Sequence, residues 1–413
     1  MNLFTLPPDA PFLDTLARAW LDRAGTAEPL AAASGMILLP TRRAARAMAE
    51  AFLRVTDGAA LVLPRITALG ALDEAPLVLT GALDLPPAIE PSYRLALLAR
   101  LILAMGGAYG APRSADRAWA LAAELAALMD DAERAGIDLA ARLPEAADPA
   151  FAAHWAQTVS FLRIVTASWP ALLAELGLAN PAARSAALLA AQAEAWERDP
   201  PTEPVWLAGT TAAIPAVARL AGVLARAKLG AVVLPGLDTD LPEAAWEALG
   251  PEHPQAGLRA LLGRLGATRA DVRPWPDIHG RRPGRVALLR TALLPGAALE
   301  TWRDPGGPVA DPSLCRLEAA DTQAEALAIA LILRDALERP GATAALVTPD
   351  RSLAGRVAAE LLRFGVVADD SAGERLSDTP PASFLRLLAR AVASGLAPVP
   401  LLALLKHPFA AAG

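Results

Sequence analysis

The stretch MILLPTRRAARAMAEAF, residues 36–52, predicts a buried strand that leads directly into a helix. The apolar run at 37–39 is typical of a short strand in a protein core. Thr41 is a suitable N-cap residue for the helix that follows. Apolar residues then recur at helical spacing along one face: Ala45, Met48 and Phe52. A strand followed at once by an amphipathic helix is the repeating unit of an α/β fold.

Arginines occupy the first turn of this predicted helix. Arg42 and Arg43 follow the cap, and Arg46 comes one turn later. Each cation near a helix N-terminus opposes the macrodipole at a cost of about 0.3–1 kcal/mol. Free N–H groups and guanidinium groups together form a good anion site. The alternative is that the three arginines only solvate a surface helix, and their spacing leaves both interpretations open.

Composition limits the possible classes of protein. A chain of 413 residues, 54% of them hydrophobic, predicts about two or three domains. A formal charge of −6 argues against a wholly basic nucleic-acid coat but allows a local basic patch. The single cysteine, Cys315, excludes a disulfide framework and a cysteine-ligated cluster within the chain. The start, MNLFTLPPDAP, does not look like a signal peptide, and no apolar run of about 18 residues avoids charges and prolines, so a cytoplasmic protein is expected.

Strand and helix patterns alternate in the opening and central parts of the chain. Strands are expected at 3–6 and 36–40, each followed by a helix, with a further strand and turn in ALVLPRITALGAL, residues 60–72. Strands return at 203–210 and 231–238, on either side of a helix. The Arg- and Pro-rich segment 252–310 is interpreted as loop, linker and surface helix.

The closing block repeats this pattern loosely. Thr322 and Glu325 predict a capping box at the start of a helix. ATAALVTPD, residues 342–350, is interpreted as a strand, and a helix ended by Gly365 follows. The similarity to residues 36–52 suggests two related α/β domains, although any two strand–helix units of this composition would look alike.

These patterns predict an α/β protein with a P-loop NTPase-like (RecA-like) parallel sheet, an all-helical insertion, and the start of a second RecA-like domain. The predicted boundaries are 1–90 and 201–290 for the first α/β domain, 91–200 for the insertion, 291–310 for a linker, and 311–413 for the second domain.

The first strand–helix turn, LFTLPPDAPFLDTL, lacks the chemistry of a phosphate loop. The pattern GxxxxGK[ST] supplies glycines and a lysine, whereas this turn has neither. Pro7, Pro8 and Pro11 also remove three N–H donors. ATP binding at this turn is therefore not expected.

Other catalytic or metal-binding patterns are not visible. The strand at 205–208 ends in Ala208-Gly209 without a carboxylate for magnesium. Asp238 and Asp240 follow the next strand and are interpreted as solvated loop acids. The four histidines lack metal-ligand spacing, and no nucleophile elbow, HExxH or paired carboxylate motif is found. No catalytic residue, metal ligand or cofactor site is predicted.

Arginines are concentrated between residues 256 and 290, where Trp275 is the aromatic residue. They are Arg259, Arg264, Arg269, Arg273, Arg281, Arg282, Arg285 and Arg290. Basic residues interleaved with a stacking side chain suit single-stranded nucleic acid. A solvated linker explains the same composition.

LLPTRRAARAMAEAF resembles the Ia-type DNA-contacting motif of superfamily 1 helicases, in the form found in the AddB subunit of alphaproteobacterial AddAB helicase–nucleases. Further stretches resemble that family in the same order along the chain: PPDAPFLDTLARAWL, VWLAGTTAAIPAVARL, VVLPGLD, HPQAGLRALLGRLG, AALVTPDRSLAGRVAAELLRFGVVADDSAGERLSDTPPASFLRLLA and LLALLKHPF. The resemblance covers nearly the whole chain, although no single motif would carry it.

The resemblance implies helicase-like domains that have lost their nucleotide motifs and act as a DNA-binding scaffold, similar to the inactive helicase folds of the RecC subunit. They would receive a single strand unwound by the AddA motor subunit and take part in sensing a recombination hotspot. ATP and magnesium would belong to AddA. Family members continue into a nuclease domain with magnesium and an iron–sulfur cluster, so the chain is expected to be a fragment or a truncated product.

The DNA-binding residues expected on this basis lie in two turns. Thr41, Arg42, Arg43 and Arg46 would meet a phosphate at the helix start, and Arg65, near the next strand end, would extend the contact. In the second domain, the equivalent turn holds Thr348 and Arg351. Two alternatives remain open, namely an active motor subunit with a divergent nucleotide site and a plain α/β interaction protein.

Overall fold

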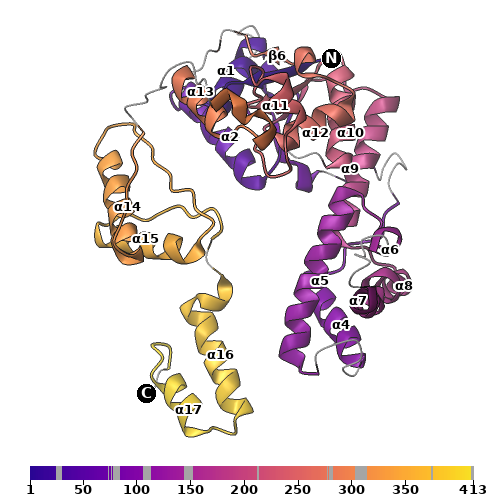
Figure 1. The fold of residues 1–413 in the computed structure, drawn as a ribbon, viewed down its shortest axis with the longest axis vertical. Coiled ribbons are helices and arrows are strands. Elements are labelled where there is room, and N and C mark those ends of the chain that lie inside the picture. The colour runs from indigo at the N-terminus through magenta and orange to yellow at the C-terminus, as the bar shows by residue number, and fades with distance from the viewer. Residues whose placement is uncertain are drawn as a thin grey trace. The chain divides into compact units, whose positions relative to one another are not determined.

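The chain forms two compact units, Met1–Asp311 and Pro312–Gly413. They are seen in a computed structural model (Figure 1). The structure describes residues 1–24, 30–72, 74, 75, 77, 84–105, 113–143, 152–211, 214–276, 278, 282–302, 314–373 and 375–410.

A six-stranded, all-parallel sheet forms the centre of the first unit, which confirms the predicted α/β class. The strands, in the order β3-β2-β4-β5-β1-β6, are β1 (Leu3–Leu6), β2 (Met36–Leu39), β3 (Arg65–Ala68), β4 (Val205–Ala208), β5 (Gly230–Pro235) and β6 (Arg273–Pro274). Such a sheet is compatible with a RecA-like fold.

Helices cover both faces of this sheet, which is why the central strands β2, β4 and β5 are apolar. On one face α1 (Phe12–Ala24) and α2 (Arg42–Val55) pack on Ile37 and Leu39 of β2. On the other face Leu38 belongs to a cluster with α10 (Pro215–Arg226) and α12 (Ala256–Leu265). Successive residues of one strand therefore enter opposite layers of core.

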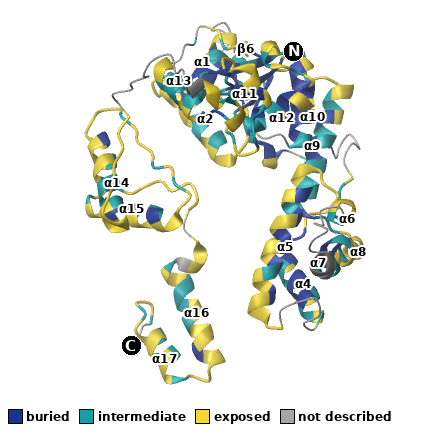
Figure 2. Ribbon diagram, viewed as in Figure 1, coloured by how far each residue is buried: buried dark blue, intermediate teal, exposed yellow. Residues whose placement is uncertain are grey.

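The predicted helical insertion has a hydrophobic core of its own, visible as the buried faces of α4 and α5 in Figure 2. Its helices are α4 (Pro91–Ala104), α5 (Ala115–Ala135), α6 (Leu139–Arg142), α7 (Ala152–Arg163), α8 (Trp169–Leu176) and α9 (Pro181–Arg198), with a π-helical turn at Ile164–Ser168. Within the described residues, Thr158–Leu176 is the one helical stretch long and apolar enough to cross a membrane. Its Trp169 and Leu173 are buried against this helical core.

The segment 252–310 contains more regular structure than predicted. Besides α12 it holds β6, α13 (Pro283–Ala292) and a 3₁₀ turn at Gly296–Trp302, and α11 (Glu243–Glu247) precedes it. β6 was missed because it has only two residues, one of them a proline. Proline is tolerated at a sheet edge but gives no strand signal.

The second unit consists of helices: α14 (Thr322–Leu337), α15 (Arg351–Arg363), α16 (Pro380–Ala393) and α17 (Pro398–Leu405). The strand predicted at 342–350 is wrong, because the described part of this unit contains no strand, and the second RecA-like sheet is not observed there. A segment without a neighbouring strand has no partner for its backbone N–H and C=O groups, so it does not form a strand. The predicted capping box is also wrong, because Asp321 caps α14 by accepting a 2.8 Å hydrogen bond from the Ala324 N–H.

Candidate functional site

The candidate site lies at the carboxyl edge of the sheet. Because all strands are parallel, the turns that follow them meet at this edge, where ligands bind in open α/β sheets. The turn after β2 leads into α2, and those after β1 and β5 lie side by side because the two strands pair. The turn after β2 holds the predicted DNA-contacting arginines, and the turn after β1 is the one compared with a phosphate loop in the sequence analysis.

The start of α2 has the geometry that the sequence predicts. Thr41 is extended (φ −136°, ψ 157°), and its hydroxyl oxygen accepts a 3.0 Å hydrogen bond from the Ala44 N–H. The hydroxyl hydrogen is left to donate elsewhere. Arg42, Arg43 and Arg46 are exposed. Among the residues that the structure describes, Arg42 and Arg46 have no ion-pair partner.

Arg65 does not belong to this group, so its predicted place beside the helix start is wrong. It is the first residue of β3 and pairs in register with Met36, the first residue of β2. Thr41 lies five positions beyond Met36, roughly 16 Å along the strand direction at about 3.3 Å per residue. The error arose because the strand begins at Arg65, whereas the sequence suggested one that includes residues 60–64. Arg65 therefore lies at the amino edge of the sheet.

In the second unit, Thr348 and Arg351 lie at a helix start of different chemistry. Thr348 accepts a 3.0 Å hydrogen bond from the Asp350 N–H, and Asp350 caps α15 through the Ser352 and Leu353 N–H groups. Arg351 is paired with Asp370 at 3.1 and 2.5 Å. This pair raises the pKa of Arg351, chiefly through the hydrogen bond to Asp370. The guanidinium is thus already engaged with a carboxylate.

The turn after β1 is closed by its own contacts. The Ala10 N–H donates to the Pro7 carbonyl at 3.1 Å. Gly236, after β5, has φ +60°, and a Cβ added there would lie 3.1 Å from the Pro8 Cβ. The proline turn therefore packs closely against the β5 turn. In the turn after β1, Pro7, Pro8 and Pro11 have no N–H group and the Ala10 N–H is already used, so this turn offers few donors to a phosphate.

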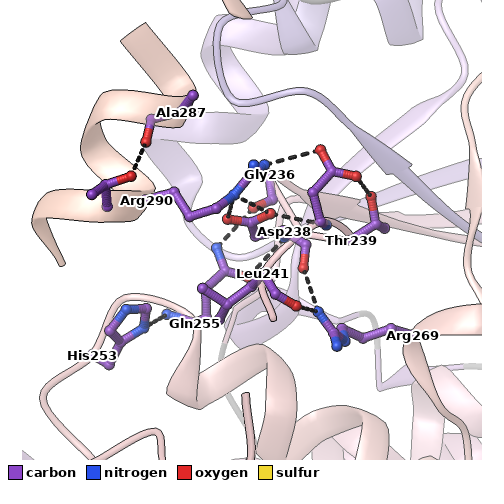
Figure 3. A network of polar contacts seen from close by, with 11 residues as sticks. Gly236, Asp238, Thr239, Leu241, His253, Gln255, Arg269, Ala287 and Arg290 are labelled. Atoms are coloured by element: carbon purple, nitrogen blue, oxygen red, sulfur yellow. Dashed lines mark hydrogen bonds and ion pairs between the residues drawn. The ribbon is translucent and has the colours of Figure 1, made fainter. Parts of the chain in front are cut away.

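Asp238 and Asp240 are engaged with Arg290 of α13 (Figure 3). The Arg290 Nε lies 2.7 and 2.9 Å from the two Asp238 carboxylate oxygens, and its Nη2 lies 3.0 Å from Asp240 Oδ2. Burial alone would lower the pKa of Arg290, but the two aspartates outweigh it and raise the pKa. The interpretation of Asp238 as a solvated loop acid is wrong, because its side chain is only 13% exposed.

Two side chains, from Gln255 and Arg269, hold the backbone of the Asp238 loop in place. Gln255 accepts from the Asp238 N–H at 3.0 Å and donates to the Gly236 carbonyl at 2.9 Å. Arg269 donates to the Leu241 carbonyl at 2.6 Å and to the Asp238 carbonyl at 3.3 Å (Figure 3). The loop is therefore fixed by side chains from the segment that the sequence suggested to be linker. Residues this far apart in the chain leave no spacing signal that would have revealed these contacts.

Several arginines of the 256–290 segment also have structural partners. Arg259 pairs with Glu247 at 3.2 Å, Arg269 pairs with Glu243, and Arg273 lies over the Phe4 ring. Trp275 packs edge-on against Trp206 and Phe4, with ring centroids 5.7 and 5.2 Å apart. Trp275 is thus partly buried against the sheet's core, which argues against the predicted stacking platform for bases in this segment.

The fold and this edge define an α/β protein whose parallel sheet carries proline and carboxylate residues where a nucleotide site would lie. No protein-family model matches the chain, and a search of curated proteins finds no matching relative. Among the described residues there is no cluster of three or more histidine, cysteine, aspartate or glutamate side chains that could hold a metal ion.

Proposed function

We propose that this chain is a non-catalytic, helicase-like scaffold that binds unwound single-stranded DNA within a cytoplasmic complex that processes DNA double-strand breaks. The observation that carries the proposal is the start of α2. There, exposed Arg42, Arg43 and Arg46 stand beside the Thr41 hydroxyl at the carboxyl edge of a parallel sheet. Strand phosphates would be held by guanidinium groups, the hydroxyl donor and the first N–H groups of the helix. The partner would be a motor subunit of the AddA type, and hotspot sensing would be a function of the assembled complex.

The turn after β1 supports the non-catalytic part of the proposal. Its three prolines and the used Ala10 N–H favour a turn without a phosphate cradle, and Asp238 on the neighbouring turn is paired with Arg290. A motor subunit would need a lysine in the turn after β1 and a magnesium-binding acid at the end of β4, where this chain has Ala208 and Gly209. ATP would therefore be bound and hydrolysed by the partner subunit.

The test is fluorescence anisotropy of a labelled single-stranded oligonucleotide, titrated with the chain over a salt series. We compare the wild type with the Arg42→Ala/Arg43→Ala double variant. The wild type should bind, and the variant should bind more weakly. Its salt slope should be shallower by about 0.7 for each phosphate that is no longer neutralised, or about 1.4 for two.

Arg100→Ala/Arg117→Ala is the matched control, since it removes two exposed arginines from the helical insertion. It should keep the wild-type affinity and slope. If both double variants weaken binding equally, the affinity reflects overall charge and the plain interaction protein is the better description. DNA-stimulated ATP hydrolysis by the purified chain would instead support the active motor.

A further inference from the structure

A cavity of about 460 Å³ remains at the carboxyl edge, between the turns after β1 and β5 and helix α13. This volume is typical of a small-molecule or side-chain pocket. Its apolar walls are formed mainly by prolines and α13 side chains: Pro7, Pro8, Pro254, Pro274, Val286 and Leu289. Such walls suit an aliphatic chain.

The charged residues that line the cavity are predominantly acidic. Asp9, Asp238 and Asp240 face a single arginine, Arg290, among the described lining residues. Arg290 already pairs with Asp238 and Asp240, through Nε and Nη2, at 2.7 to 3.0 Å. Asp9 is therefore left without a cation from this lining. The described charged residues of the lining therefore carry a net negative charge, which favours a cation over a phosphate.

One carboxylate oxygen of Asp9 is left without a partner. Its Oδ2 accepts a hydrogen bond from the Arg282 backbone N–H, whereas its Oδ1 is buried and makes no hydrogen bond. A buried carboxylate oxygen with no donor is unfavourable, so such atoms are rare in folded proteins. Oδ1 itself is closed to a water-sized molecule, so a cation held in the cavity would offset the charge of the Asp9 carboxylate without a hydrogen bond to that atom.

We propose that this cavity binds an organic cation with an aliphatic stem, that is, an alkyl guanidinium or alkyl ammonium group. The cationic head would pair by charge with the Asp9 carboxylate, and the methylene stem would lie along the proline walls. Long basic side chains are buried in this manner, with apolar stems packed and charged heads paired. The site thus takes a ligand of opposite charge to a nucleotide, at the edge where a nucleotide would bind in related folds.

The test is isothermal titration calorimetry of the full chain without DNA. Agmatine serves as the free-cation probe, and N-acetyl-arginine methylamide represents an arginine side chain from a protein partner. At least one probe should bind, and the tighter one identifies the source. Binding of ATP or inorganic phosphate at this cavity, or no binding of either cation at millimolar concentration, would overturn the proposal.

Asp9→Asn tests the named contact, and Asp22→Asn on the exposed part of α1 is its control. Asn keeps an oxygen for the Arg282 N–H but removes the charge, so cation affinity should fall at least tenfold. The control should bind as the wild type does. Equal binding by all three proteins contradicts the proposal.

A second variant covers the case in which Asp9→Asn folds poorly. Arg290→Gln removes the resident guanidinium and leaves Asp238 without its partner, so agmatine should bind at least threefold more tightly than to the wild type. Unchanged or weaker binding to a folded Arg290→Gln variant would show that the cavity does not select cations. Neither variant alters the start of α2, so failure here is distinguishable from failure of DNA binding.

Discussion

The chain contains two helix starts that look alike in sequence and differ in chemistry. LLPTRR leads from β2 into α2, and LVTPDR leads into α15. At the first, a threonine caps the helix and the arginines that follow are exposed. At the second, Asp350 caps the helix and Arg351 is held by Asp370. Only the first turn follows a strand that is paired on both sides.

This difference indicates where anion binding is to be expected. An aspartate cap supplies the negative charge that a helix N-terminus attracts, so little attraction is left for a phosphate. A threonine cap satisfies one N–H group and leaves the positive end uncompensated. The α2 start is therefore the stronger candidate for a DNA contact. At the α15 start, residues of the chain itself already supply the cap and the partner of the arginine.

The largest expected effect concerns how firmly each helix is packed. Phe52 of α2 is 1% exposed and lies in the core formed with α1 and the sheet. Phe52→Ala should lower the free energy of unfolding by about 3–5 kcal/mol because it removes a large side chain and leaves a cavity. Leu361→Ala in α15 should cost about 2 kcal/mol, near the low end for such truncations, because its cluster is small.

Urea denaturation followed by circular dichroism measures both variants, and the exposed Leu53→Ala serves as the control. Its free energy of unfolding should stay within about 0.5 kcal/mol of the wild type, as is usual for exposed positions. If Leu361→Ala cost as much as Phe52→Ala, the α14–α15 cluster would be as well packed as the sheet's core. The two helix starts would then differ in their capping and charge but not in how firmly their helices are packed.

The first unit, which contains the sheet, was more predictable from sequence than the second unit, whose described part is helical. Apolar runs such as 37–39 are unambiguous when a strand is buried on both faces, and the alternation of Ile37, Leu38 and Leu39 between two cores explains the run. The run at 342–347 has similar composition but no neighbouring strand in the described structure, so it forms no ladder. Local sequence reports whether a segment suits a sheet but not whether a partner strand is present.

The candidate site was predictable only in its local part. The Thr41 cap and the exposed arginines follow from residues adjacent in sequence, and both are found at the start of α2. The prediction that Arg65 lies beside the start of α2 was wrong because it depended on where β3 begins, and β3 begins at Arg65 itself. The Asp238–Arg290 pair joins residues 52 positions apart, and only the folded sheet and α13 bring them together. Contacts of this kind cannot be read from spacing.

An intermediate effect is expected when the α2 start receives an aspartate cap like that of α15. Thr41→Asp keeps an acceptor for the Ala44 N–H and adds a charge that the helix dipole favours, so stability should be equal or higher by a few tenths of a kcal/mol. The same carboxylate would repel a phosphate beside Arg42 and Arg43. Anisotropy titration with single-stranded DNA should therefore show several-fold weaker binding with no loss of stability. Unchanged affinity would mean that DNA does not approach this helix start.

The smallest effect is expected at the second turn. Asp370→Asn removes the charge that pairs with Arg351 but keeps an oxygen for the Ala372 N–H, which Asp370 accepts at 2.9 Å. Exposed ion pairs contribute little to stability, so the urea midpoint should not change measurably. If Arg351 is held back from DNA only by Asp370, the variant should bind single-stranded DNA slightly more tightly at low salt, and the gain should vanish at high salt. If affinity is identical at every salt concentration, Asp350 and the cap geometry, rather than the ion pair, are what separate the α15 start from the α2 start.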